Sequence, residues 1–265
     1  MGFLWNEIWL PDAIRAAKRA GFDAVECHWP YDIAARDVRK ALSETGLTML
    51  GLNTRRGNVD IGEMGLAAVP GRVQEACLHA DEALAYARDI GARMVHVMAG
   101  NADGQEAEDT FVHTLLRVGQ KAAKHDQMIL IEPLNAYDAP GYFLKTTPQA
   151  VKILRRVGLT NVRLMFDCYH VGRTEGDVET RLQDVFAYIG HIQFAAVPDR
   201  GEPLHGTFDF LRFIKRLEGL GWDAPLGAEY KPVASTEESL GWLKSLRAKR
   251  SRKRRLTTDL FLAVF

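Results

Sequence analysis

Four apolar stretches of this chain each end on a polar side chain whose oxygen atoms could bind a metal ion. They are Leu130-Ile131-Glu132, Leu164-Met165-Phe166-Asp167, His191-Ile192-Gln193 and Gly227-Ala228-Glu229. By subtraction of their residue numbers, the end residues are 35, 26 and 36 positions apart, which is about one strand-plus-helix unit of roughly 30 residues or more. Successive parallel strands would therefore bring three carboxylates and one amide to the same rim.

A cavity that holds three carboxylates favours a bound divalent cation, because acidic groups that are crowded together repel each other and lose hydration. Gln193 adds a neutral oxygen and so limits the excess of negative charge. An all-oxygen ligand set favours Mg²⁺ or Mn²⁺ over zinc, which prefers nitrogen and sulfur. The sequence predicts that the metal ligands are Glu132, Asp167, Gln193 and Glu229. The alternatives are a surface ion pair for Glu132 and a backbone-bonding role for Gln193.

Two of the predicted ligands could also move protons. Glu132 and Glu229 would face each other across the mouth of a barrel, where one removes a proton from the carbon beside a carbonyl and the other returns it at the adjacent carbon. A cation that stabilises charge on the intermediate's oxygens would support this ene-diol route between aldehyde and ketone.

Other polar residues near the same strand ends are candidates for substrate binding. His170 follows Asp167 by three positions and could donate a hydrogen bond to a substrate oxygen while neutral. Arg200 lies on a predicted loop, where its planar guanidinium could bind an anionic group. For three further candidates, a structural role is favoured over a functional one: Glu26, His28 and His96.

The elements that would position these residues form an α/β pattern. Amphipathic helical segments alternate with short apolar strands, and 265 residues suit one (β/α)8 TIM barrel, which usually takes about 250. Strands are predicted at 24–27, 48–52, 93–98, 127–132, 162–167, 190–194 and 226–230. Helices are predicted near 11–20, 32–46, 73–90, 106–124, 147–156, 178–188, 208–219 and 235–247. The segment 53–72 is predicted to be a working loop over the barrel mouth.

Both ends of the chain depart from a regular barrel. The first strand is expected at Gly2-Phe3-Leu4-Trp5 and is shortened, so that either the barrel closes on a short strand or the true start lies upstream. We expect a single barrel domain at 1–246, followed by a basic and then apolar tail at 247–265 that is disordered, because blocks of like charge seldom fold. A localisation signal, an anchor to an anionic surface and a reading-frame artefact are the alternatives for this tail.

Charge and cysteine content limit the classes of partner. Residues 247–255 hold seven of the 34 basic residues, which leaves 27 basic against 33 acidic residues in 1–246. Such a body disfavours nucleic acid, and the three scattered cysteines do not indicate a disulfide framework. Because neither a signal peptide nor a membrane span of about 20 apolar residues is present, we expect a cytoplasmic enzyme of small molecules without a membrane partner. A homo-oligomer is left open.

The motifs together resemble the hydroxypyruvate isomerase family, which belongs to the xylose isomerase-like barrels. The resemblance rests on Ile131-Glu132-Pro133-Leu134-Asn135, Pro140-Gly141-Tyr142-Phe143-Leu144, Phe166-Asp167-Cys168-Tyr169-His170, Glu175-Gly176-Asp177, Gly190-His191-Ile192-Gln193, Val197-Pro198-Asp199-Arg200 and Glu229-Tyr230. It implies isomerisation of a small hydroxy-oxo acid, either hydroxypyruvate to tartronate semialdehyde or a 2-oxo-tetronate analogue. It also implies Glu132 and Glu229 as the acid/base pair, the same four metal ligands, and His170 and Arg200 near the substrate.

The chain departs from the family pattern in one loop that bears on substrate preference. After Pro203 the family usually continues with Asp and Gly-Glu, whereas this chain has Leu204-His205-Gly206-Thr207. The rival functions are a ketose 3-epimerase, a nuclease of the abasic-site type and a non-catalytic sugar-binding barrel. Substrate length and metal identity do not follow from the sequence.

Overall fold

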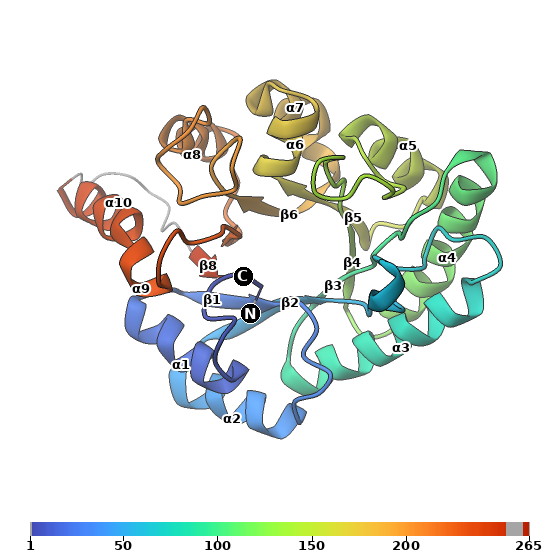
Figure 1. The fold of residues 1–265 in the computed structure, drawn as a ribbon, viewed down its shortest axis with the longest axis horizontal. Coiled ribbons are helices and arrows are strands. Elements are labelled where there is room, and N and C mark those ends of the chain that lie inside the picture. The colour runs from blue at the N-terminus through green and yellow to red at the C-terminus, as the bar shows by residue number, and fades with distance from the viewer. Residues whose placement is uncertain (1, 253–261, 265) are drawn as a thin grey trace.

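Eight parallel strands close into a barrel, and the helices between them form an outer ring (Figure 1). This computed structural model describes residues 2–252 and 262–264. The strands, each hydrogen-bonded to the next around the ring, are β1 (Ala24–Cys27), β2 (Thr48–Asn53), β3 (Met94–His96), β4 (Met128–Ile131), β5 (Val162–Asp167), β6 (Ile189–Phe194), β7 (Leu226–Ala228) and β8 (Leu262–Val264). The TIM-barrel prediction is confirmed.

The helices occur close to where the apolar periodicity predicts them. They are α1 (Leu10–Ala20), α2 (Ala35–Thr45), α3 (Val73–Ile90), α4 (Gly104–Ala123), α5 (Thr147–Val157), α6 (Cys168–Thr174), α7 (Val178–Val185), α8 (Phe210–Gly219), α9 (Thr236–Ser239) and α10 (Gly241–Arg252). The described part of the chain also contains two short 3-10 helices, η1 (Val59–Ile61) and η2 (Phe186–Tyr188). Helix α6 was not predicted, and the segment expected as one helix at 235–247 is divided into α9 and α10.

Local chemistry sets the ends of the helices. The Thr146 side chain accepts a hydrogen bond from the backbone N–H of Gln149 at the start of α5. Gly158 ends the same helix at φ 66°, a left-handed conformation that glycine adopts without a steric penalty. Such stops return the chain promptly to the next strand, so that each strand begins at the bottom of the barrel and ends at its mouth.

The strand that closes the barrel comes from the end of the chain, which corrects two predictions. Residues 3–7 form a bend and a turn instead of a first strand, while Leu262–Val264 lies between β7 and β1 and pairs in parallel with both. All three residues of β8 are buried, with at most 1% of their surface exposed. They satisfy two strand edges that would otherwise present unpaired backbone groups. The expected disorder at 247–265 is thus wrong for 262–264 and also for 247–252, which belong to α10 (Gly241–Arg252), while 253–261 and 265 lie outside the described residues.

Leu4 and Trp5 near the N-terminus are buried beside the barrel instead of within its sheet. Trp5 is 2% exposed, its backbone N–H donates to Thr236 Oγ1 at 2.9 Å, and its indole N–H donates to Glu237 Oε1 at 2.6 Å. The apolar character of Leu4 and Trp5 therefore reflects burial, with Trp5 against α9, and not strand formation. None of the helices in the described part of the chain is long and apolar enough to cross a membrane.

Replacement of Leu262 by alanine tests whether β8 completes the barrel. Because this side chain is 1% exposed, we expect Leu262→Ala to lower the free energy of unfolding by about 2–5 kcal/mol, as for other buried leucines. Urea denaturation followed by circular dichroism measures the change. Val233→Ala, at a side chain that is 86% exposed, is the control and should change little. Equal stability of Leu262→Ala and the control would contradict the assignment of β8.

Candidate active site

The four predicted ligands lie at the carboxyl ends of four consecutive strands. Glu132 follows β4, Asp167 is the last residue of β5, Gln193 is the next-to-last residue of β6, and Glu229 follows β7. Asp167 is in register with Gln193, and all four side chains are buried, with exposed fractions of 5% or less. The fold thus brings the four to one end of the barrel, where β/α barrels build their active sites.

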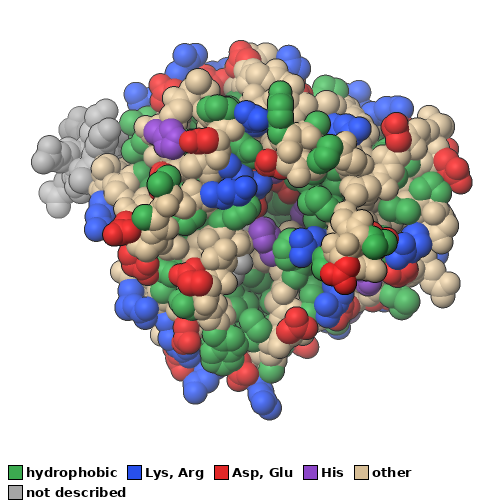
Figure 2. Space-filling model, in the orientation of Figure 1, with side chains coloured by type: hydrophobic (Ala, Val, Ile, Leu, Met, Phe, Trp, Pro, Cys, Tyr) green, Lys and Arg blue, Asp and Glu red, His purple; other side chains and the backbone are tan. Residues whose placement is uncertain are grey.

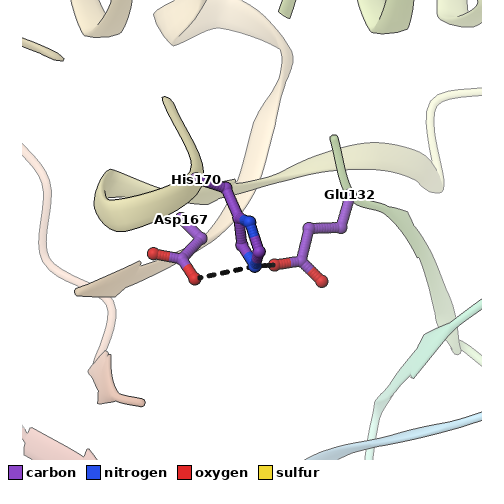
Figure 3. A group of neighbouring side chains, drawn as sticks. All are labelled: Glu132, Asp167 and His170. Atoms are coloured by element: carbon purple, nitrogen blue, oxygen red, sulfur yellow. Dashed lines mark ion pairs between the residues drawn. The ribbon is translucent and has the colours of Figure 1, made fainter. Parts of the chain in front are cut away.

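Three side chains of types that can bind a metal ion form a compact cluster at this end (Figure 3). Glu132, Asp167 and His170 each offer an atom that lies within 4.8 Å of the others. His170 stands between the two carboxylates, with Nε2 4.0 Å from Glu132 Oε1 and 3.8 Å from Asp167 Oδ2. Glu229 is not part of this group and instead pairs with Arg200, whose Nη2 is 2.8 Å from Glu229 Oε1.

Three buried oxygen atoms of the predicted ligands have no hydrogen-bond partner. They are Glu132 Oε1, Asp167 Oδ2 and Gln193 Oε1. The other oxygen of Asp167 accepts from the backbone N–H of Tyr169 at 2.8 Å, so this carboxylate is only half satisfied. Buried polar atoms are almost always paired, and three unpaired oxygens at neighbouring strand ends need a common explanation. A divalent cation fits, because carboxylate and amide oxygens are the ligands that Mg²⁺ and similar ions prefer.

The balance of charge in the site also fits a cation. Glu26, Glu132, Asp167 and Glu229 are buried there, while Arg200 is the one Lys or Arg that is buried in the described part of the chain. Its Nη2 lies 2.8 Å from Glu229 Oε1 and 3.5 Å from Asp167 Oδ2. One guanidinium offsets one of the four carboxylates, and further positive charge would relieve the repulsion that remains.

The carboxylates differ in their affinity for protons. Burial, followed by the charges of Glu229 and Asp167, raises the pKa of Glu132 well above its usual value. Burial also raises the pKa of Asp167 to about 7, although Arg200 opposes the shift. For Glu229 the effect of burial is outweighed by Arg200 and by the hydrogen bond to His28, and the pKa is lowered. The two glutamates are therefore shifted in opposite directions, which is typical of an acid/base pair.

Asn135 determines which nitrogen of His170 carries the proton. The Asn135 side-chain oxygen accepts from the backbone N–H groups of Tyr137 and Asp138, both at 3.0 Å, so its amide nitrogen must point the other way. That nitrogen and the backbone N–H of Asn135 lie 2.7 and 3.0 Å from His170 Nδ1, which accepts from both. The proton is consequently on Nε2, the atom that faces Glu132 and Asp167. Nε2–H can donate to a substrate but has no lone pair for a metal ion.

Three residues for which the sequence favoured a structural role lie against the predicted ligands. His28 Nε2 is 3.4 Å from Glu229 Oε1, and His96 Nδ1 is 3.6 Å from Glu132 Oε2. Glu26 accepts a hydrogen bond from Gln193 Nε2 at 3.0 Å. His28 follows β1 and His96 ends β3, so the pattern that predicted the four ligands, a polar residue at the end of an apolar strand, also applied to these two histidines. Glu26 lies within β1, and this pattern did not apply to it.

Arg200 reaches the site, as predicted, but its guanidinium turns inward. It lies over the rings of Phe3 and Tyr169, with its central carbon 4.7 and 5.0 Å from the ring centroids. Its Nη1 is 3.6 Å from Asp138 Oδ2. In Figure 2 the centre of the molecule is hollowed, and histidine and basic side chains border the hollow.

Comparisons with known proteins agree with this fold. Residues 14–246 match the family described as xylose isomerase-like TIM barrel. The chain is 40% identical over 248 residues to the 2-oxo-tetronate isomerase of Cupriavidus necator, covering 92% of this chain and 95% of that protein. It is 32% identical to the hydroxypyruvate isomerase of Escherichia coli, with coverages of 87% and 91%. A crystal structure described as an AP endonuclease, family 2, from Brucella melitensis superposes with a TM-score of 0.89 at 34% identity, covering 92% and 96%.

The chain belongs to the xylose isomerase-like TIM-barrel family. The curated relatives above are isomerases, and the protein is an enzyme of the isomerase class.

The protonation of His170 can be observed directly. Burial, followed by Arg200 and His96, lowers the pKa of this imidazole well below its usual value, so it should stay neutral with its proton on Nε2 from pH 5 to 8. We expect ¹⁵N-detected NMR of the metal-free protein to show a protonated Nε2 and an unprotonated Nδ1, with the signal assigned by its loss in His170→Gln. A proton on Nδ1, or a titration within this range, would contradict the role of Asn135.

Proposed function

We propose that this protein interconverts the aldehyde and ketone forms of a small hydroxy-oxo acid, either hydroxypyruvate and tartronate semialdehyde or a 2-oxo-tetronate analogue. The observation that carries the proposal is the set of three buried oxygens without a hydrogen-bond partner, from Glu132, Asp167 and Gln193, at neighbouring strand ends. The activities named for the relatives from C. necator and E. coli support the substrate class.

In this proposal Glu132, Asp167, Gln193 and Glu229 hold a divalent cation, Mg²⁺ or Mn²⁺. When bound, the cation would supply positive charge that stabilises the oxygens of an ene-diol. His170 is left out of the ligand set because the hydrogen bonds from Asn135 place its proton on Nε2.

The two glutamates would move the proton. Glu229, whose pKa is lowered, is suited to remove a proton from C3 of hydroxypyruvate. Glu132, whose pKa is raised, is suited to deliver a proton to C2. The hydroxyl proton on O3 passes to O2 in the same interconversion, so the product is tartronate semialdehyde with no net change in atoms or electrons.

His170 and Arg200 would orient the substrate. The Nε2–H of His170 donates to a substrate oxygen without adding charge to the site. The Arg200 guanidinium, which already lies beside Glu229 and Asp167, attracts the acid group of the substrate toward the reacting carbons. Both groups are held by neighbouring side chains, and such pre-organisation favours a reactive alignment.

The alternatives predict different products. A ketose 3-epimerase would invert one carbon and keep the carbonyl in place, and a sugar-binding barrel would bind without turnover. The nuclease alternative is disfavoured by the acid-leaning body of the chain. A cytoplasmic location, the absence of nucleic-acid and membrane partners, and the oligomeric state remain predictions.

Incubation of the Mn²⁺-loaded protein with hydroxypyruvate in D₂O tests the reaction class. We expect NMR to show tartronate semialdehyde with deuterium at the carbon that receives the proton, because the removed proton exchanges with solvent through the glutamates. A panel that includes four-carbon 2-oxo acids and ketoses identifies the preferred substrate. A product that keeps the carbonyl position would contradict the proposal and favour an epimerase.

The glutamate variants test the assignment of the acid and the base. Glu132→Gln and Glu229→Gln should each lower kcat by about 100- to 10,000-fold, the usual contribution of a positioned acid or base. Glu106→Gln, at an exposed position on α4, is the control and should retain wild-type turnover. Comparable turnover in either site variant and the control would remove that glutamate from the mechanism.

Cation binding should depend on pH because protons compete for the same oxygens. With the pKa of Asp167 at about 7 and that of Glu132 raised, both groups tend to be protonated at low pH and must lose protons when they bind the ion. We expect the affinity for Mn²⁺ to fall as pH decreases from 7.5 to 5.5, by about tenfold per pH unit for each proton displaced. Calorimetry in two buffers of different ionisation enthalpy measures the proton release. An affinity that is constant over this range would contradict the ligand assignment.

A further inference from the structure

Glu26 is a buried carboxylate of the barrel that the proposed mechanism does not use. It lies in β1 with 2% of its surface exposed, and both of its oxygens are engaged. Oε1 accepts from His191 Nε2 at 2.9 Å, and Oε2 accepts from Gln193 Nε2 at 3.0 Å. Both partners are on β6, and β7 and β8 stand between β6 and β1 in the ring. The contact therefore reaches past two strands through the interior of the barrel.

Gly227 on β7 leaves room for this contact. A Cβ atom at this position would lie 2.5 Å from Glu26 Oε1 and 2.9 Å from Gln193 Cγ, both closer than non-bonded atoms approach. Gly227 is in register with Gln193 on the neighbouring strand. Any larger residue here would push Glu26 away from β6.

The hydrogen bond to Glu26 fixes the orientation of the Gln193 amide. A side-chain amide can present either its oxygen or its NH₂ group in a given direction, and the two orientations fill the same volume. Here the NH₂ group faces a carboxylate, which can only accept hydrogen bonds when ionised. The reverse orientation would set the amide oxygen against the carboxylate. Oε1 is thereby kept on the other side of the amide, where it is buried without a partner.

We propose that Glu26 is a positioning residue that makes Gln193 a metal ligand, by holding the amide so that its oxygen and not its NH₂ group faces the cation. This role of Glu26 rests on the proposed function, because it requires the metal site formed by Glu132, Asp167, Gln193 and Glu229. Glu26 touches neither substrate nor cation in this account. Residues that hydrogen-bond to metal ligands act in this way, and their loss typically lowers metal affinity by about 10- to 100-fold.

An exchange of the two side chains tests the proposal. In Glu26→Gln, the oxygen of the new amide can accept the hydrogen bond from His191 only if its NH₂ group faces the NH₂ group of Gln193. The Gln193 amide is then expected to rotate, so that its NH₂ group and not its oxygen faces the cation. In Gln193→Glu, two carboxylates face each other. The double variant Glu26→Gln/Gln193→Glu has the same volume and charge as the wild type. In it the amide on β1 donates to the carboxylate on β6, so the hydrogen bond runs in the opposite direction while an oxygen still faces the cation.

Mn²⁺ titration by calorimetry on the folded full-length chain measures the effect. We expect Glu26→Gln to weaken binding by about 10- to 100-fold and the double variant to recover to within about threefold of the wild type. Gly227→Ala, which displaces Glu26, should weaken binding as Glu26→Gln does. Glu108→Gln removes a buried carboxylate on α4 that pairs with Lys152 and Arg156, and as the matched control it should bind Mn²⁺ like the wild type.

The outcomes separate this inference from the rest of the mechanism. Wild-type affinity for Mn²⁺ in Glu26→Gln would overturn the positioning role of Glu26. The same holds if the fold-loss of Mn²⁺ affinity in the double variant equals the product of the fold-losses in the two single variants, because a purely structural role gives independent effects. Thermal unfolding midpoints measured without metal identify any variant that fails to fold. If Glu26→Gln fails to fold, the Mn²⁺ affinities of Gly227→Ala and of the double variant test the role of Glu26 instead. If the wild type binds no Mn²⁺, this inference and the metal site fail together. If Mn²⁺ binds as expected but hydroxypyruvate is not turned over, only the substrate assignment fails.

Discussion

The crowding of carboxylates in the barrel mouth is the constraint on which the rest of the site depends. Glu26, Glu132, Asp167 and Glu229 are withdrawn from water within one cavity, and each loses hydration while it repels the others. Arg200 compensates part of this charge, and the neutral state of His170 avoids adding another charge to be solvated. Proton uptake by Glu132 and Asp167 relieves the remainder when no cation is bound. A cation would do the same while leaving the oxygens available for chemistry.

The barrel supplies the positions of these groups, and hydrogen bonds behind them supply their orientations. Consecutive parallel strands end at one rim, so residues far apart in sequence become neighbours. Asn135 fixes the proton of His170, and Glu26 fixes the amide of Gln193. In the proposed site, groups that do not bind the ion therefore determine which side chains can serve as ligands. His170 is near the carboxylates but is a donor, whereas Gln193 presents a free oxygen.

The sequence predicted most of the barrel and the convergence of the four proposed ligands because both follow from local patterns. A polar residue at the end of an apolar strand, repeated at the spacing of one strand and one helix, is visible without any tertiary information. The role of Glu26 is not visible in this way, since it depends on Gly227 leaving space between strands that are distant in sequence. The proton position of His170 depends similarly on the turn that Asn135 forms.

The closure of the barrel was predicted wrongly for a related reason. Leu262–Val264 is a short apolar segment that follows a block of basic residues, and nothing in its own sequence identifies its partners. Its place between β7 and β1 is set by the gap that the other strands leave. Gly2-Phe3-Leu4-Trp5 has a similar apolar character but packs Trp5 against α9. Short apolar segments carry too little periodicity to distinguish a strand from a buried turn.

A crystal structure of the protein grown with Mn²⁺, with the ion located by its anomalous scattering, tests most directly whether the four proposed ligand side chains bind one divalent cation. We predict one strong peak within ligand distance of Glu132, Asp167, Gln193 and Glu229, with the amide oxygen of Gln193 toward the ion and His170 Nε2 outside the coordination sphere. A peak that is bound by His170 Nε2, or an absence of any peak between the four side chains at saturating Mn²⁺, would contradict it.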